Sequence, residues 1–276
     1  GYGVSSGKIE ITGGDITAVG GKSAAGIGGS GYRGNADITI SGGTIRATGG
    51  DQAAGIGGGT SGNGKVTITG DAVIEESIGG SSGAGAGNAT GGAGIGGGAM
   101  GAGENITISD GAHVTANGGA QGAGIGGGYA GNAKNIIIRG HSKVTATARD
   151  GAAIGGGSAG WSSYYGGSAK GIVICDHATV AARSDMGHGA AIGAAGDNGK
   201  DTEAEVTIGT AGATAEQEDV HVTATGFCGS AIGNGAKDTK VTIQGHSTIR
   251  MESERGNSTA IGSKDGNVEV NIKDNV

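Results

Sequence analysis

The sequence predicts an all-β chain that winds as a right-handed, single-stranded parallel β-helix, with three short strands per coil and about eight to nine coils. Two observations predict this fold. A small-residue motif, Ala-Gly-Ile-Gly-Gly-Gly in its fullest form, recurs eight times, and each repeat also carries apolar pairs two residues apart. The central isoleucines of the motif are Ile27, Ile56, Ile95, Ile125, Ile154, Ile192, Ile232 and Ile261. A repeat of this kind is typical of a solenoid, in which each unit buries its apolar face by stacking on the next.

The first strand of each unit reads Ile-x-Ile or Val-x-Ile. A spacing of two puts both members of a pair on one face of a strand. The pairs are Ile9/Ile11, Ile38/Ile40, Val66/Ile68, Ile106/Ile108, Ile136/Ile138, Ile172/Ile174, Val206/Ile208, Val241/Ile243 and Val270/Ile272.

The second and third strands follow the same rule with smaller residues. The second strands carry Ile16/Ala18, Ile45/Ala47, Val114/Ala116, Val144/Ala146, Val180/Ala182, Val222/Ala224 and the variant Ile249/Met251. The third strands carry Ala25/Ile27, Ala54/Ile56, Ala93/Ile95, Ala123/Ile125, Ala152/Ile154, Ala190/Ile192, Ser230/Ile232 and Thr259/Ile261. The β-branched residues favour strands, and no helical periodicity is present.

These strands imply a simple geometry. One coil rises by one inter-strand spacing of ~4.8 Å, so about eight coils span roughly 40 Å. Parallel strands joined by crossovers favour the right-handed winding. Like residues then stack from coil to coil, and the outward positions of the first strand form a ladder rich in threonine, which is typical of a finished sheet face.

Three insertions interrupt the repeat. Successive motif isoleucines are 29, 39, 30, 29, 38, 40 and 29 residues apart, so the basic unit has about 29 residues. The extra residues lie at about Ser77 to Gly91 in the third coil, Gly155 to Lys170 in the fifth and Gly209 to Asp219 in the seventh. Insertions in repeat proteins map to loops, often on the binding side, although loops also tolerate neutral changes in length.

Composition excludes several classes. Of 276 residues, 69 are Gly and none is Pro. Collagen needs Gly at every third position and abundant Pro, and plain disorder predicts no apolar periodicity. The formal net charge of −7 disfavours nucleic acid as a partner. The sequence contains no run of about 18 apolar residues, so we do not expect it to insert into a membrane.

The domain prediction is a single β-helix domain over residues 1–276. A solenoid needs polar caps, and neither end of the sequence carries one, so we expect a segment of a longer multidomain protein with flanking domains. Cys175 and Cys228 are too few for a disulfide framework. They are predicted to be free thiols.

The aromatic residues are the main candidate binding residues, because the chain has only one Trp, five Tyr and one Phe. Five of them follow a third strand and should share one edge of the solenoid: Tyr32, Tyr129, Trp161, Tyr164 and Tyr165. Exposed Trp and Tyr rings mark recognition surfaces, and sugar rings stack on them. The alternative is that the loop around Trp161 folds back and covers the solenoid flank.

A second cluster is Cys175-Asp176-His177, with His141 and His246 at the matching corners of other coils. Catalytic triads are assembled in space and not in consecutive order, so no catalytic residue is assigned. His141 and His177 should lie one coil apart, close enough to share a metal ion. No third ligand is evident, and no metal site is assigned.

No cofactor is assigned, and calcium stays open. Turns such as Asp197-Asn198-Gly199 and Asp265-Gly266-Asn267 offer oxygen ligands. They also form readily without a metal, and they lack the acidic spacing of a calcium loop.

The segment Ile38 to Gly50, followed by Ala54-Gly-Ile-Gly-Gly-Gly59, resembles the Gly-rich β-helix repeat modules of surface proteins from Gram-positive, often gut-dwelling, bacteria. The resemblance covers nearly the whole chain. It implies an extracellular or cell-surface location and a role in adhesion or glycan binding. The wider β-helix superfamily includes pectate lyases and glycosidases, whose carboxylate clusters are not matched on the first-strand ladder here.

Three functions are therefore open. The first is a non-catalytic adhesin or binding module that recognises a glycan or a host macromolecule. The second is a polysaccharide-active lyase or glycosidase, which needs two carboxyl groups facing a sugar. Glu216, Glu218 and Asp219 in the seventh-coil insertion are the residues that could supply such a pair. The third is a passive stalk that spaces other domains.

Overall fold

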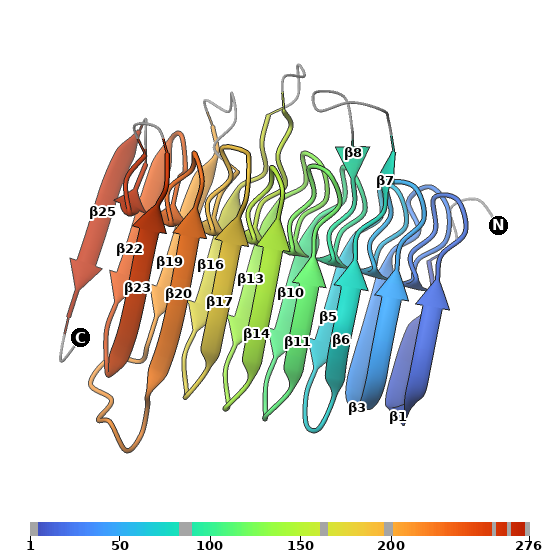
Figure 1. Ribbon diagram of the computed structural model, residues 1–276, viewed down its shortest axis with the longest axis horizontal. Helices are drawn as coiled ribbons and strands as arrows, with labels where there is room; N and C mark the ends of the chain where they lie inside the picture. The colour runs from blue at the N-terminus through green and yellow to red at the C-terminus, as the bar shows by residue number, and fades with distance from the viewer. Residues whose placement is uncertain are drawn as a thin grey trace.

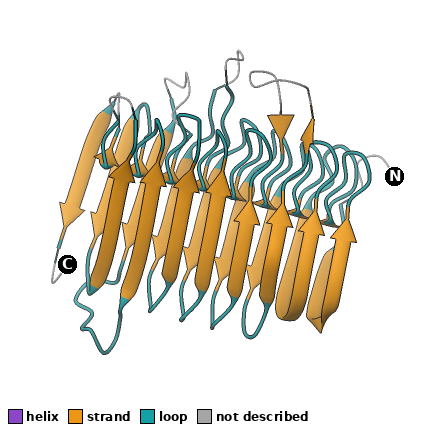
Figure 2. Ribbon diagram, in the orientation of Figure 1, coloured by secondary structure: helices purple, strands orange, loops and turns teal. Residues whose placement is uncertain are grey.

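The computed structural model describes residues 5–82, 90–160, 165–195, 201–255, 258–263 and 266–273. Within these residues the chain is all β and folds as a parallel β-helix, as predicted (Figures 1 and 2). The winding is consistent with the right-handed sense that parallel crossovers favour. The coils stack along the long axis of the molecule, with the two termini at opposite ends (Figure 1). The described residues contain no helix that is long and apolar enough to cross a membrane.

The first and second strands of all coils belong to one fifteen-stranded sheet. Two strands run through both positions: β1 (Lys8–Val19) and β3 (Ala36–Thr48). The remaining first strands are β5 (Gly64–Ile68), β10 (Gly103–Ile108), β13 (Ala133–Ile138), β16 (Ala169–Ile174), β19 (Glu203–Ile208), β22 (Asp238–Ile243) and β25 (Asn267–Ile272). The remaining second strands are β6 (Val73–Ile78), β11 (His113–Asn117), β14 (Lys143–Ala148), β17 (Thr179–Ser184), β20 (Val220–Gly226) and β23 (Ser247–Ser253).

The third strands form a separate eight-stranded parallel sheet. They are β2 (Ile27–Gly28), β4 (Ile56–Gly57), β9 (Ile95–Gly96), β12 (Ile125–Gly126), β15 (Ile154–Gly155), β18 (Ile192–Gly193), β21 (Ile232–Gly233) and β24 (Ile261–Gly262). We number the coils by these strands, from β2 in the first coil to β24 in the eighth. They lie at the top of Figure 1.

Register between coils places like residues on like residues. Ile106 pairs with Ile136, Ile136 with Ile172, and Ile172 with Val206. In the inner coils these side chains have no exposed surface, and they join the second-strand and third-strand residues in one continuous core. The outward ladder predicted for the first strand is confirmed, since Thr39 pairs with Thr67 and Thr207 with Thr242. Burial of stacked Ile and Val is therefore what holds the solenoid together.

The predicted core is less covered at the two ends. In β25 the side chains of Val268, Val270 and Ile272 are 45%, 41% and 62% exposed, whereas Val241 in β22 is completely buried. In β1, Ile9 and Ile11 are only half-buried. Among the described strands, β1 pairs only with β3 and β25 only with β22, so their apolar residues keep contact with water.

The glycines of the third strands allow a close approach of backbone between neighbouring coils. Gly126 has φ +137°, and a Cβ placed on it would lie 2.1 Å from the carbonyl oxygen of Gly155 in the next coil. At Gly96 the situation is the same, because a Cβ placed there would lie 2.1 Å from the carbonyl oxygen of Gly126. A side chain does not fit at such positions, which explains why the motif repeats Gly there.

The corner between the first and second strands, which we call the first corner, changes along the chain. In β1 and β3 the backbone passes through it on consecutive glycines, and Gly14 and Gly43 have positive φ. From the fourth to the sixth coil two consecutive residues with positive φ make the corner, as in a type I′ turn. These pairs are Asp110/Gly111, Gly140/His141 and Asp176/His177. Asp, Asn and His are the non-glycine residues most often found in this conformation.

Core residues stay paired across the three insertions, with local register shifts in β6 and between β16 and β19. The third-coil insertion includes a short antiparallel pair, β7 (Ser81–Ser82) and β8 (Thr90–Gly91). In the seventh coil, the strands on either side of the insertion still pair with the sixth and eighth coils. The insertion therefore lengthens the corner without separating the coil from its neighbours.

Candidate binding sites

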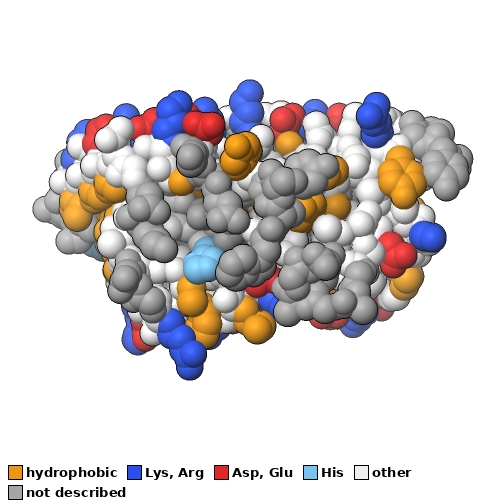
Figure 3. All heavy atoms as spheres, turned by 90° about the horizontal axis from the view of Figure 1, so that it is seen from above, with side chains coloured by type: hydrophobic (Ala, Val, Ile, Leu, Met, Phe, Trp, Pro, Cys, Tyr) orange, Lys and Arg blue, Asp and Glu red, His pale blue; other side chains and the backbone are white. Residues whose placement is uncertain are grey.

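The turns that follow the third strands carry exposed apolar side chains. We call residues 29–35, 58–63, 97–102, 127–132, 156–160 and 165–168 the third-strand edge. Tyr32 is 48% exposed, Met100 47% and Tyr165 59%. Figure 3 looks onto this side of the molecule and shows hydrophobic side chains at several places along it. Tyr32 lies in the first coil and Tyr165 after the fifth, so about four coil spacings, roughly 19 Å, separate them along the axis.

The prediction that Tyr129 belongs to an exposed aromatic platform is wrong, because the residue is only 6% exposed. Its ring packs in a small cluster with Ala99 of the preceding coil and Ala159 of the following one. These small side chains leave room for the ring between neighbouring turns. Tyr32 occupies the same position of its turn, just before a residue with positive φ, but has a described neighbouring turn on one side only. The burial of Tyr129 gives it a packing role.

Several predicted site residues lie outside the described residues. They are Trp161 and Tyr164 of the fifth-coil insertion, and the acidic turn residues Asp197, Asn198, Gly199 and Asp265.

At the first corner, the Cys175-Asp176-His177 cluster folds as a tight turn. The amide of Ala178 donates to the carbonyl of Cys175 at 3.3 Å, and the positive φ values of Asp176 and His177 complete the turn. The rings of His141 and His177 stack with centroids 4.5 Å apart, so the two histidines lie one coil apart as predicted. Within the described part of the chain, no three His, Cys, Asp or Glu side chains are grouped so that they could hold a metal ion.

Asp219 links two further histidines at this corner. Its carboxylate lies 3.1 Å from Nε2 of His221 and 3.5 Å from Nδ1 of His246. His221 is the second residue of β20 in the seventh coil, and His246 lies at the first corner of the eighth. Asp219 therefore ties the end of the insertion to the strand that follows it and to the next coil.

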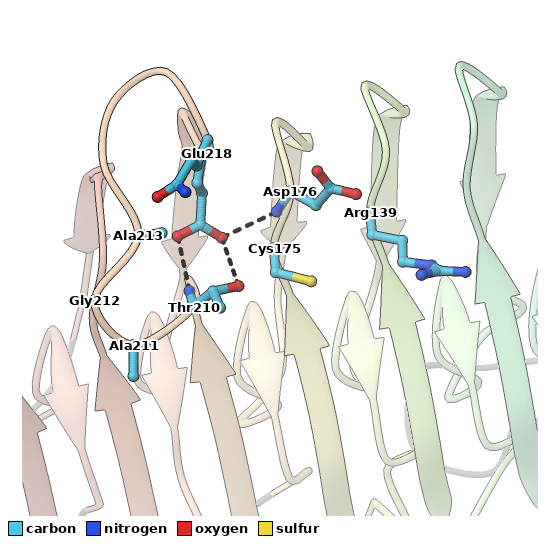
Figure 4. Close-up of a pocket in the computed structure, with 9 residues that line it drawn as sticks. Arg139, Cys175, Asp176, Thr210, Ala211, Gly212, Ala213 and Glu218 are labelled. Carbon is cyan, nitrogen blue, oxygen red and sulfur yellow. Dashed lines mark hydrogen bonds between the residues drawn. The ribbon is translucent and has the colours of Figure 1, made fainter.

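The seventh-coil insertion, residues 209–219, is anchored by Glu218. This side chain is 1% exposed, and three donors point at its carboxylate. Oε1 accepts from the Asp176 amide at 3.0 Å and from the Thr210 hydroxyl at 3.1 Å, and Oε2 accepts from the Thr210 amide at 2.7 Å (Figure 4). Buried carboxylates are stable when donors satisfy them in this way. Glu216 is exposed. Of the three carboxylates considered for an enzymatic pair, Glu218 is thus already engaged in structural hydrogen bonds.

A pocket of about 570 Å³ lies between this insertion and the first corners of the fifth and sixth coils. Its lining residues are Arg139, Cys175, Asp176, Thr210, Ala211, Gly212, Ala213, Gln217 and Glu218. Figure 4 shows Cys175 and Asp176 between Arg139 on one side and the insertion on the other. Arg139, Cys175 and Gly209 occupy the same place in successive coils, directly after the first strand. The pocket exists because the insertion replaces a tight turn and forms a wall beside its neighbours.

The pocket environment raises the pKa of the Cys175 thiol. Burial is the largest cause, and the carboxylates of Glu218 and Asp176 add to it, while Arg139 acts in the opposite direction. A raised pKa lowers the thiolate fraction, and the thiolate is the nucleophile. We therefore expect Cys175 to react with iodoacetamide more slowly in the folded protein than in denaturant at about pH 8. Mass spectrometry of the labelled peptide measures both rates, and a faster reaction in the folded state contradicts this assignment.

Sequence reasoning found Cys175, Asp176 and Glu218 as separate features but missed Arg139, Thr210 and Gln217. Arg139 and Cys175 each come directly after the last residue of a first strand, in β13 and β16. That alignment alone places Arg139 beside Cys175. The repeat pattern contains no comparable signal for the direction in which the insertion folds.

The comparisons with known proteins support the repeat assignment. The sequence model of the β-helix repeat family matches residues 9–32, 38–60, 106–129 and 136–158. These stretches are parts of the first, second, fourth and fifth coils, each running from the first strand into the turn after the third strand. No curated protein and no solved structure matches the chain. The chain is a solenoid built from repeats similar to those of the β-helix repeat family.

Proposed function

We propose that this chain is a non-catalytic binding module that recognises a glycan through its third-strand edge. The exposure of Tyr165 carries the proposal: its ring is 59% exposed in a chain that has only seven aromatic residues. Tyr and Trp combine a flat apolar face with a polar end, and an exposed ring of this kind is a platform for the C–H face of a sugar. Trp161, Tyr164 and Tyr32 belong to the same proposed surface.

The proposed location is the outer surface of a bacterial cell, with the glycan on a host or on a neighbouring cell. The Gly-rich repeats, and their resemblance to bacterial surface modules, support this location. The acidic net charge of −7 fits a partner other than nucleic acid.

A glycan array followed by titration calorimetry tests the proposal. We expect Tyr165→Ala to weaken binding of the recognised glycan about tenfold, because stacking on one ring contributes up to about 1.5 kcal/mol. Trp161→Ala is expected to weaken it as well. Tyr165→Phe keeps the ring and should bind almost as the unmodified chain does.

The outcomes separate the candidate functions. Equal affinities for the unmodified chain and for Tyr165→Ala would remove Tyr165 from the site. An array without any bound glycan would overturn glycan recognition. Release of sugar from a polysaccharide panel would instead identify an enzyme.

A further inference from the structure

A pocket lies on the opposite side of the coils from the third-strand edge. It is the pocket between the seventh-coil insertion and the first corners of the fifth and sixth coils. The first corners lie at the bottom of Figure 1, and the third-strand turns lie at the top. Its volume of about 570 Å³ falls within the range of small-molecule sites.

The wall of this pocket is fixed before any ligand arrives. Glu218 ties the insertion to the amide of Asp176 and to both the amide and the hydroxyl of Thr210. Within the insertion, the amide and the hydroxyl of Thr214 both donate to Oε1 of Gln217. A wall held in this way loses little conformational entropy on binding, which favours affinity.

Arg139 and Asp176, two exposed residues among those that line the pocket, have opposite charges. Arg139 is exposed, and none of the ion pairs within the described residues involves it. Asp176 is also exposed, with 53% of its side chain accessible and its Oδ1 3.5 Å from Nδ1 of His177. An anionic ligand would meet Asp176 and Glu218, and a cationic ligand would meet Arg139. A neutral ligand that carries both donors and acceptors is compatible with all three.

Adjacent hydroxyl groups meet this requirement. A carboxylate accepts hydrogen bonds from two neighbouring hydroxyls, and a guanidinium donates to their oxygens. We propose that the pocket binds one uncharged sugar residue through vicinal hydroxyls, with Asp176 as the acceptor and Arg139 as the donor. This site does not depend on the aromatic surface of the third-strand edge.

Protection of Cys175 from alkylation reports occupancy of the pocket directly, because this thiol lines it. The probes are neutral methyl glycosides, with a uronic acid and an amino sugar as charged counterparts. Cys228, a second free thiol away from the pocket, is the internal reference. We expect a neutral glycoside to slow labelling of Cys175 in a saturable way while labelling of Cys228 stays unchanged.

Asp176→Asn is the decisive variant. Asn tolerates the left-handed backbone of this position and keeps the amide that Glu218 binds. We expect at least a tenfold increase in the glycoside concentration needed for protection, and a comparable increase for Arg139→Gln. Asp71→Asn, an exposed residue at the first corner of the third coil, is the matched control and should behave as the unmodified chain does.

Three results would overturn the proposal: no protection by any neutral glycoside, protection unchanged in both pocket variants, or stronger protection by the uronic acid or the amino sugar. Tyr165→Ala should leave protection of Cys175 unchanged. Failure of the pocket is therefore distinguishable from failure of the aromatic surface.

Discussion

Gly126→Ala is expected to lower the free energy of unfolding by about 2–6 kcal/mol, because it combines an unfavourable backbone conformation, about 1–3 kcal/mol, with overpacking, also about 1–3 kcal/mol. Gly126 has φ +137°, which L side chains rarely adopt, and its Cβ would lie 2.1 Å from the oxygen of Gly155. The obstacle is backbone of the next coil. Relief requires the two coils to move apart, and this would break hydrogen bonds on that side of the solenoid.

Gly13→Ala is the matched control. Gly13 lies in β1, and a Cβ there would meet no heavy atom within 4 Å. Chemical denaturation followed by circular dichroism compares the two variants, and hydrogen exchange locates the change. The damage from Gly126→Ala should centre on the fourth and fifth coils, because each coil contacts only its neighbours. Coincident unfolding midpoints for the two variants would show that the glycine motif is not required by packing.

Glu218→Gln is expected to lower the free energy of unfolding by about 2–3 kcal/mol and to release the seventh-coil insertion. The carboxylate accepts from three donors, two of them backbone amides. In glutamine, one of the two oxygens is replaced by an NH₂ group, which would face a donor. A buried donor without a partner costs about 1–3 kcal/mol.

Glu216→Gln, at an exposed position two residues earlier, removes the same charge without touching these contacts. Its stability should stay within about 0.5 kcal/mol of the unmodified chain. Hydrogen exchange of the amides of Asp176 and Thr210 distinguishes the variants, since both donate to Glu218. Unchanged protection of these amides in Glu218→Gln would mean that the insertion is held by other contacts.

The architecture was predictable because each column of the core repeats one residue type. Ile136 stacks between Ile106 and Ile172, and Ile125 between Ile95 and Ile154. Period-two pairs identify strands, and the recurring order of three such pairs in each coil aligns them, so register follows without knowledge of distant contacts. The free state of both cysteines is likewise confirmed.

The conformation of the turns was less predictable, because it depends on neighbouring coils. Tyr129 and Tyr32 occupy the same turn position, yet one is buried and the other exposed. What differs is the number of described turns beside each ring and the small size of Ala99 and Ala159. No pattern within a single repeat carries that information.

The pocket was the least predictable feature. The repeat interval locates the insertion, but its shape depends on a hydrogen bond between Glu218 and Asp176, which are 42 residues apart in the sequence. Glu218 was identified only as an acidic residue that could take part in catalysis. Its burial and its three donors give it an architectural role that composition alone does not reveal.

The stacking of the coils also determines how the molecule would bear mechanical load. The hydrogen bonds between coils run along the long axis, because the strands lie across it (Figure 1). Tension between the two ends would load one row of bonds at a time, as in unzipping, and would not shear many rows together. Such a body yields in small steps and lengthens by about one 29-residue coil at each step, so it would dissipate a pull gradually.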